Sequence, residues 1–199
     1  MNKMLLVAGL VFMAVASMAT ADEALLRIDS VKDKEPRSSV ALIDSKDGWQ
    51  FWGFGVNQPD PTLQVGRQLK PIKLGDLTVI PIAYLSFQTG PERFALDPWL
   101  IVKKPVGEGL LVAKLASRLP LDGTTKSFYS IESSLTVPIE KKWRIGVAAT
   151  TWKTEGKQPW TVPWGPKVEW SGKGLRINAL LLNQGSGDRL ARIEFVWSQ

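Results

Sequence analysis

The 199-residue sequence contains neither cysteine nor histidine. Without cysteine the chain can form no disulfide bond and can carry no lipid-modified N-terminal cysteine. Without histidine it lacks the usual general base and the commonest metal ligand. The two absences together exclude zinc and other metal sites built from nitrogen and sulfur ligands. We therefore expect no cofactor and no metal site.

A long apolar run is also missing once the N-terminus is passed, so the sequence predicts no transmembrane helix. At the N-terminus itself, Lys3 precedes a short apolar run over residues 4–16, and Ala19-Thr20-Ala21 matches an A-x-A cleavage signature. The run is too short to span a bilayer comfortably. Residues 1–21 are therefore predicted to be a secretory signal peptide, and a disulfide-free exported chain of this size suits a bacterial envelope.

The formal net charge of +6 is the one feature that points toward nucleic acid or an anionic surface. Export argues against nucleic acid as a partner, and the basic residues are scattered along the chain rather than clustered. Residues 22–48 are mostly polar and contain one charge-rich patch, "DSVKDKEPRSS". We interpret them as an N-terminal extension, with a folded domain over residues 49–199.

From Trp49 onward, segments of period-2 alternation are separated by turn residues, which indicates antiparallel β-structure. Tight connections at 74–76, 107–109, 140–142 and 171–174 alternate with mostly longer or more polar ones. This arrangement predicts an all-β fold, an antiparallel up-and-down β-barrel of about 8–10 strands. The ten predicted segments are 49–56, 62–72, 77–88, 94–104, 110–120, 127–138, 143–153, 160–170, 175–183 and 189–197.

Each of these segments has one apolar face and one face of small residues with isolated charges. In a soluble barrel the apolar face turns inward, whereas in a transmembrane barrel it turns toward lipid. Three features favour lipid: strands of nearly the length that crosses a bilayer, a polar face too sparsely charged for open solvent, and the spacing of tryptophan. Trp160 and Trp170 share a face and lie ten residues apart, which corresponds to an apolar band about 25 Å tall. The aromatic residues predicted at the membrane interfaces are Trp143, Trp160, Trp164, Trp170 and Trp197.

These features together resemble the small outer-membrane β-barrel proteins of Gram-negative-type bacteria. The C-terminal segment "RLARIEFVW" is similar to the assembly signal of that class, with Ile193, Phe195 and Trp197 at alternate positions. The resemblance implies an outer-membrane location, with outer-membrane lipid and the outer-membrane assembly machinery as partners. Enzymes resembling this architecture rely on histidine, so no enzymatic activity is expected. The resemblance covers residues 49–199 and identifies no subfamily.

If the apolar faces turn outward, the isolated charges line the lumen. Around "SGKG" we predict that Trp170 pairs with Leu175, which places Glu169 opposite Arg176; one strand further, Leu175 meets Trp197 and Ile177 meets Phe195. The lumen is expected to be narrow or plugged, and any conductance to favour small anions. The residues predicted to face the lumen are Lys114, Arg118, Glu132, Arg144, Lys167, Glu169, Arg176, Arg192 and Glu194.

The favoured interpretation is a non-enzymatic outer-membrane barrel, either a narrow porin-like channel or a structural envelope protein. One alternative is a soluble periplasmic barrel that binds a lipophilic ligand, as lipocalins do, because segments 77–88 and 94–102 are apolar on both faces. Another is an enzyme using carboxylates such as Asp97 and Glu132, although nothing in the sequence brings these two together.

Overall fold

The computed structural model describes residues 21–31, 34–89, 93–121, 126–154, 162–183 and 189–198. Within these residues no helix is long and apolar enough to cross a membrane, a finding that concerns helices alone. The described chain forms one antiparallel sheet of thirteen strands. The strands are β1 (Glu23–Val31), β2 (Arg37–Ile43), β3 (Trp49–Phe54), β4 (Thr62–Gln68), β5 (Ile72–Leu74), β6 (Leu77–Gln88), β7 (Arg93–Val106), β8 (Gly109–Pro120), β9 (Phe128–Glu140), β10 (Trp143–Thr154), β11 (Trp164–Gly172), β12 (Leu175–Asn183) and β13 (Arg189–Ser198).

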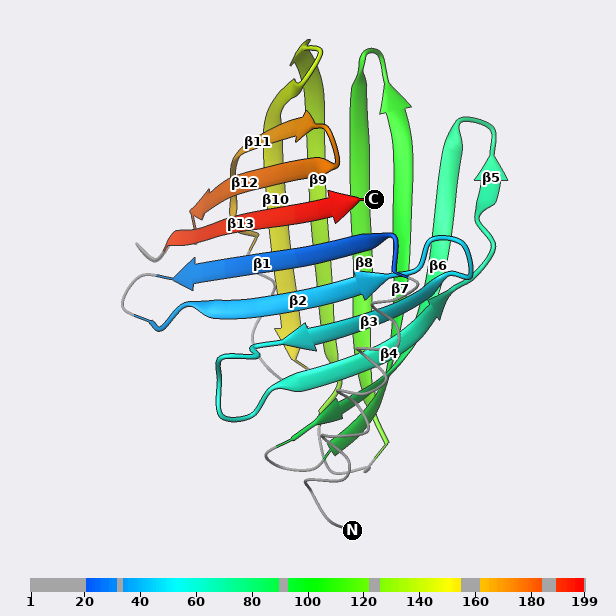
Figure 1. Ribbon diagram of the computed structural model, residues 1–199, viewed down its shortest axis with the longest axis vertical. Helices are drawn as coiled ribbons and strands as arrows, with labels where there is room; N and C mark the ends of the chain where they lie inside the picture. Colours follow the sequence, from blue (N-terminus) through cyan, green and yellow to red (C-terminus); the bar gives the residue numbers. More distant parts are fainter. Residues whose placement is uncertain are drawn as a thin grey trace.

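The sheet closes on itself, which confirms the antiparallel barrel. Neighbouring strands pair in chain order, β4 pairs with β6, and the first strand pairs with the last. Twelve of the strands in the described chain therefore form a closed barrel, while β5 pairs only with the beginning of β6. In Figure 1 the strands of the front wall cross those of the rear wall at a steep angle, as expected when barrel strands tilt strongly from the axis.

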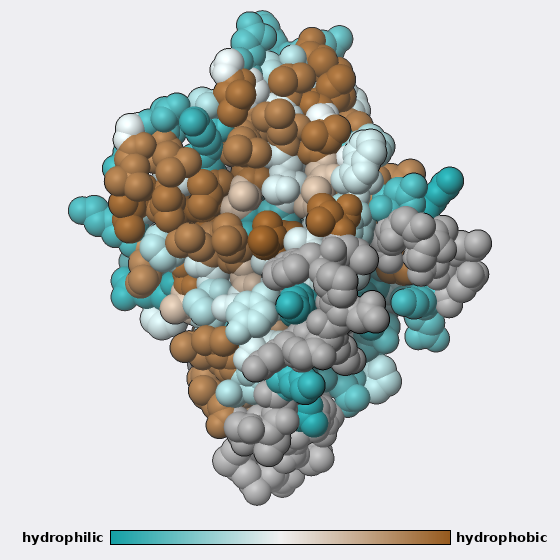
Figure 2. Space-filling view, turned by 180° about the vertical axis from the view of Figure 1, so that it is seen from behind, coloured by the Kyte–Doolittle hydropathy of each residue, from teal (hydrophilic) through white to brown (hydrophobic). Residues whose placement is uncertain are grey.

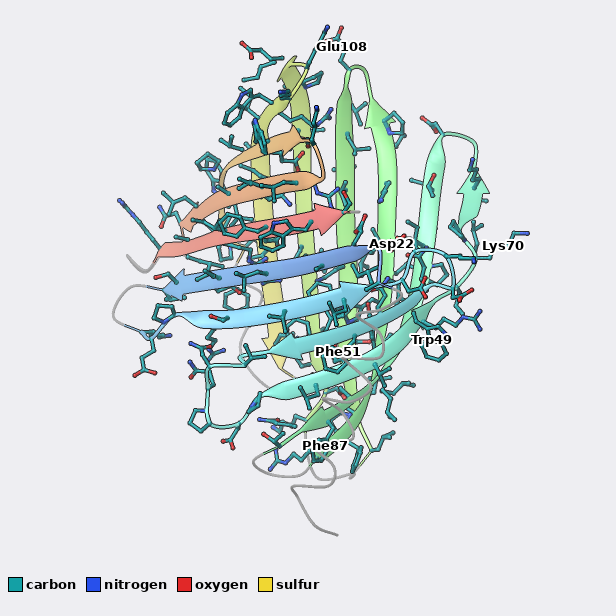
Figure 3. The ribbon with its side chains drawn as sticks, viewed as in Figure 1. Asp22, Trp49, Phe51, Lys70, Phe87 and Glu108 are labelled. Atoms are coloured by element: carbon teal, nitrogen blue, oxygen red, sulfur yellow. The ribbon has the colours of Figure 1, made fainter. Side chains whose placement is uncertain are left out.

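The two ends of the barrel differ in their connections. One end, the short-turn end, carries the connections at 44–48, 107–108, 141–142 and 173–174, together with the start of β1 and the end of β13. Glu108 marks this end at the top of Figure 3, with Asp22 and Lys70 to the right. The opposite end, the long-loop end, carries most of the longer connections and lies toward Phe87 in the same view. Short turns at one end and longer loops at the other are typical of outer-membrane barrels.

The prediction of an N-terminal extension is wrong, and with it the strand number of 8–10. β1 and β2 lie within residues 22–48 and are full members of the barrel, since β1 pairs with both β13 and β2 over most of its length. Their inward residues include Arg27 and Asp29, whose charge makes this segment look solvated in the sequence. The predicted signal peptide lies outside the described residues.

The apolar faces turn outward. Leu85, Val147 and Ile193 on three separate strands leave 49%, 50% and 44% of their surfaces exposed, and many other large apolar side chains behave alike. Figure 2 shows such side chains covering much of the outer surface behind the view of Figure 1. An apolar surface of this extent on a closed barrel suits lipid rather than water. A soluble carrier requires the opposite arrangement, with its oily face inside.

A proline removes one hydrogen-bond donor from a strand, and Pro98, Pro138 and Pro166 lie where the pairing on one side is interrupted. Pro98 pairs with β6 and Pro166 with β10, while the pairings of their strands with β8 and β12 skip these positions and resume in the same register. Pro138 lies beside a bulge between β9 and β10. Each strand thus loses pairing on one side only, and the flanking pairs keep the barrel closed.

Apolar side chains also fill part of the interior, which explains why two segments are apolar on both faces. The largest buried cluster contains Ala41, Trp52, Ile80, Ile82, Tyr84 and Trp99, from β2, β3, β6 and β7. The ring of Tyr84 lies over Gly66, where an added Cβ would come within 2.4 Å of the ring. Its hydroxyl donates a hydrogen bond to Gln50, so this side chain spans from β6 over β4 to β3.

Candidate functional site: a charged lumen

A cavity of about 830 Å³ lies inside the barrel. Exposed Lys34, Glu35 and Arg37 contribute to its lining, so it extends to the long-loop end. Six cationic residues line it, Arg27, Lys34, Arg37, Lys114, Arg118 and Arg192, against four anionic ones, Asp29, Glu35, Asp97 and Glu132. The described lining is therefore positive by two charges, which favours anions within it.

At the seam between β1 and β13, the carboxylate of Asp29 forms ion pairs with Arg27 and Arg192. Asp29 and Arg192 are direct cross-strand partners, and Arg192 Nε lies 2.6 Å from Asp29 Oδ1. Arg27 Nε donates to the same carboxylate at 3.0 Å and lies 4.0 Å from a carboxylate oxygen of Glu194. Both arginines are more than nine-tenths buried, so these contacts fix them against one wall.

Glu132 meets the same arginines from another part of the barrel. It lies on β9, which β10 to β13 separate from β1 along the sheet, so its contacts with them pass through the lumen. Its Oε1 lies 3.2 Å from a terminal nitrogen of Arg192 and 3.5 Å from one of Arg27. Its Oε2 lies 3.4 Å from Nζ of Lys114, its cross-strand partner on β8.

A second ion pair lies on the wall formed by β4, β6, β7 and β8. Asp97, which is almost fully buried, accepts hydrogen bonds from Arg118 at 3.0 Å and from the amide of Gln64. Nearby, Lys114 Nζ lies 4.2 Å from the centre of the Trp99 ring, a cation–π distance. Asp97 and Glu132 both line the cavity but belong to different ion pairs, Asp97 with Arg118 and Glu132 with Lys114.

A third cluster lies between β9 and β11, outside the cavity lining. The carboxylate of Glu169 lies 2.7 Å from Nζ of Lys167 and 3.6 Å from Nε of Arg144. Lys167 also donates to Ser134 at 3.1 Å, and Arg144 donates to the backbone oxygen of Thr136 at 2.9 Å. All these partners lie on β9, β10 and β11, so the cluster stitches neighbouring strands together.

The predicted lumen residues thus fall into separate places. Lys114, Arg118, Glu132 and Arg192 line the cavity, while Arg144, Lys167 and Glu169 form the cluster just described. Glu194 accepts a hydrogen bond from Asn178 at 3.3 Å and approaches Arg27. Arg176 lies close to the short-turn end with an exposed side chain, away from the cavity.

One register prediction is wrong and the next is right. Trp170 pairs with Ile177, and Glu169 with Asn178, because the connection is the two-residue turn Lys173-Gly174 rather than a four-residue one. The slip is two residues, so each side chain keeps its face. Between β12 and β13, the pairs Leu175 with Trp197 and Ile177 with Phe195 are as predicted.

The tryptophans predicted at the membrane interfaces divide between the two ends. Trp143, Trp170 and Trp197 lie near the short-turn end, whereas Trp164 begins β11 at the long-loop end and is 66% exposed. Trp160 lies outside the described residues. Trp49, which was not among the predicted interface residues, starts β3 at the short-turn end, with the Arg67 guanidinium 5.7 Å from its ring.

The sequence did not predict Arg27 and Asp29 as lumen residues, although their ion pairs with Arg192 and Glu132 lie at the seam and across the cavity. It also predicted no role for Gln64, which donates a hydrogen bond to Asp97. The signal for β1 was present in the alternation of "ALLRIDSV", where Leu25, Arg27, Asp29 and Val31 share one face. Apart from the contact between Arg27 and Asp29 themselves, their partners Glu132 and Arg192 lie more than 100 residues away, so their charges looked like those of a solvated extension.

Comparison with solved structures finds the same architecture in two porins and in an outer membrane protein. A KdgM porin, solved in complex with disordered oligogalacturonate, matches with a TM-score of 0.68 and 10% identity over 89% of this chain and 99% of that one. The NanC porin matches with a TM-score of 0.61 and 13% identity, over 88% and 99%. Omp33 of Acinetobacter baumannii matches with 0.55 and 11%, over 89% and 97%.

No family model and no curated protein matches the sequence. At these identities the structural likeness shows the fold. The described chain forms a small twelve-stranded antiparallel β-barrel whose fold resembles those of the KdgM and NanC porins and of the outer membrane protein Omp33. The fold and the outward apolar surface agree with the location that the sequence predicts, the outer membrane.

Proposed function

We propose that the protein is a narrow, non-enzymatic channel of the outer membrane that admits small anionic solutes. The observation that carries the proposal is the cavity of about 830 Å³ with two more cationic than anionic residues in its lining. An excess of one charge in a low-dielectric lumen concentrates ions of the opposite charge. The barrel also has the fold of several porins.

The solute class we propose is small acids of the sugar-acid type. The KdgM porin of similar fold was solved with oligogalacturonate, a chain of sugar carboxylates. In the present lumen, Arg118 and Arg192 line the cavity, and a guanidinium can bind a carboxylate through two parallel hydrogen bonds. Polar Thr62, Ser130 and Thr150 on the same lining offer hydroxyl groups to a sugar.

Lipid and assembly factors complete the proposed partners. Ile193, Phe195 and Trp197 alternate on the outward face of the last strand, and the Phe195 and Trp197 rings stack 5.9 Å apart. We assign these three residues as the signal for the outer-membrane assembly machinery. Alanine at Phe195 and Trp197 should lower the amount of folded protein in the outer membrane, while refolding in detergent remains possible.

Liposome swelling tests the channel. Liposomes containing the refolded protein should swell faster in D-glucuronate than in lysine, a cation of comparable size, and protein-free liposomes provide the baseline. Equal rates, or faster entry of lysine, would contradict anion preference. A structural envelope protein is the second candidate, because ion pairs cross the lumen between Glu132 and the seam arginines. That role predicts folded protein with no swelling in either solute.

A further inference from the structure

We propose that the contacts of Glu132 with Arg27 and Arg192 are an openable latch across the lumen, and that opening it exposes an oxyanion-binding site on the two arginines. This inference rests on the proposed channel. It gives Glu132 a specific role, that of a built-in carboxylate which occupies the site until a permeating anion replaces it.

The contacts on the two sides of the lumen differ in length. The seam contacts are short: Asp29 lies 2.6 Å from Arg192 and 3.0 Å from Arg27. The contacts across the lumen are longer, 3.2 and 3.5 Å, and both end on one oxygen of Glu132. Asp29 therefore holds both arginines through Nε, and Arg192 also through one terminal nitrogen at 3.4 Å. The other terminal nitrogen of Arg192 and one of Arg27 face the Glu132 carboxylate.

When the latch opens, the two arginines on one wall and Glu132 on the other each keep an oppositely charged partner. Arg27 and Arg192 keep Asp29, and Arg27 also keeps Glu194 within 4.0 Å. Glu132 keeps Lys114, which stands directly opposite it on the neighbouring strand. A buried charge without any partner is strongly destabilising, so an open arrangement in which every charge retains a partner is far easier to reach.

The open state presents a site for an oxyanion. Asp29 holds the two guanidinium groups, and one terminal nitrogen of each points across the lumen toward Glu132. Lys114 supplies a third cation from the facing wall. Planar guanidinium forks match carboxylate, phosphate and sulfate oxygens. A solute carboxylate placed there would make the contacts that Glu132 Oε1 makes in the closed state.

Two substitutions distinguish the effect of the side-chain length of Glu132 from the effect of its charge. Glu132→Gln removes the charge, whereas Glu132→Asp keeps the charge on a side chain one methylene shorter. Both should raise single-channel conductance in planar bilayers by about twofold or more, because both break the ion pairs of residue 132 with Arg27 and Arg192 across the lumen. Glu132→Gln alone should also increase anion selectivity.

The matched control is Glu169→Gln. This substitution removes the same charge from the barrel interior, but the ion pairs of Glu169 in the described chain are with Lys167 on its own strand and Arg144 on the adjacent strand. Its conductance should stay at the wild-type level. An equal rise in the Glu169 and Glu132 variants would show a general effect of charge and would overturn the latch.

Block of chloride current by D-glucuronate measures the exposed site. When an internal competitor occupies a site, the apparent dissociation constant of the ligand is its intrinsic value divided by the fraction of time the site is vacant. The half-blocking concentration should therefore fall at least about tenfold in Glu132→Gln relative to wild type. Glucose, which carries no charge, should block neither protein.

Folding of every variant is checked by the difference in gel mobility between unboiled and boiled samples. A conducting wild type with unchanged Glu132 variants would overturn the latch and leave the channel standing. A silent wild type with a conducting Glu132→Gln would support a latch that is closed at rest. A folded wild type and a folded Glu132→Gln that are both silent would overturn the latch and the channel together.

Discussion

The guanidinium of Arg192, on the last strand of the barrel, lies 2.6 Å from the carboxylate of Asp29 on the first. The two residues are direct cross-strand partners at the seam where the ends of the chain meet. This contact joins residues 163 positions apart in the sequence. It lies at the seam that closes the barrel, and both residues also line the charged cavity. Changes at this pair should affect both stability and ion passage.

Asp29→Asn should destabilise the barrel by about 3 kcal/mol, because Arg27 and Arg192 are buried and would lose their shared counter-charge. The measurement is urea unfolding of the refolded protein in lipid vesicles, followed by tryptophan fluorescence. Asp76→Asn, at the exposed turn before β6, provides the control and should leave the midpoint unchanged. Equal midpoints for wild type and Asp29→Asn would contradict the role of Asp29 as anchor.

Gly66→Ala should destabilise the barrel by about 1–3 kcal/mol, because the added methyl would overlap the Tyr84 ring and the Ala83 carbonyl oxygen. Tyr84→Phe keeps the ring and removes only the hydrogen bond to Gln50, so its cost should be smaller, about 1 kcal/mol. The same unfolding assay compares the two. A larger loss for Tyr84→Phe than for Gly66→Ala would show that the close approach at Gly66 is unimportant.

Leu115→Lys and Ser130→Lys test which face of the barrel meets lipid. Leu115 points outward in the middle of β8 and is 39% exposed, whereas Ser130 lines the cavity on the next strand. A lysine on the lipid face near the bilayer midplane costs about 2–4 kcal/mol, while the lumen accepts charge. Leu115→Lys should therefore fold much less stably in vesicles than Ser130→Lys. The reverse order would mean that the outer surface faces water.

The sequence predicted the fold well where alternation was regular. Its ten segments correspond to β3, β4 and β6 to β13, because an apolar residue at every second position fixes both strand and face. β1 was missed because its inward positions carry Arg27 and Asp29. A charged alternation of this kind looks the same in a solvated tail and in a barrel lumen.

The sequence predicts which charged residues of the candidate site face the lumen, but not which of them form ion pairs with one another. Parity placed Lys114, Glu132 and Arg192 inside, since a two-residue period survives an error in register such as the one at Lys173-Gly174. Which charges meet depends on closure of the barrel, which brings β1, β9 and β13 together in space. Local sequence patterns contain no information on contacts of that range.

The most direct test of the central claim, an outer-membrane channel with a cationic lumen, is the zero-current potential of the wild-type protein in a planar bilayer under a tenfold gradient of potassium chloride. We predict discrete channels whose potential has the sign of chloride selectivity, and which shifts further toward chloride in Glu132→Gln. A potential of the opposite sign, or folded protein that inserts and conducts nothing in either form, would contradict the account.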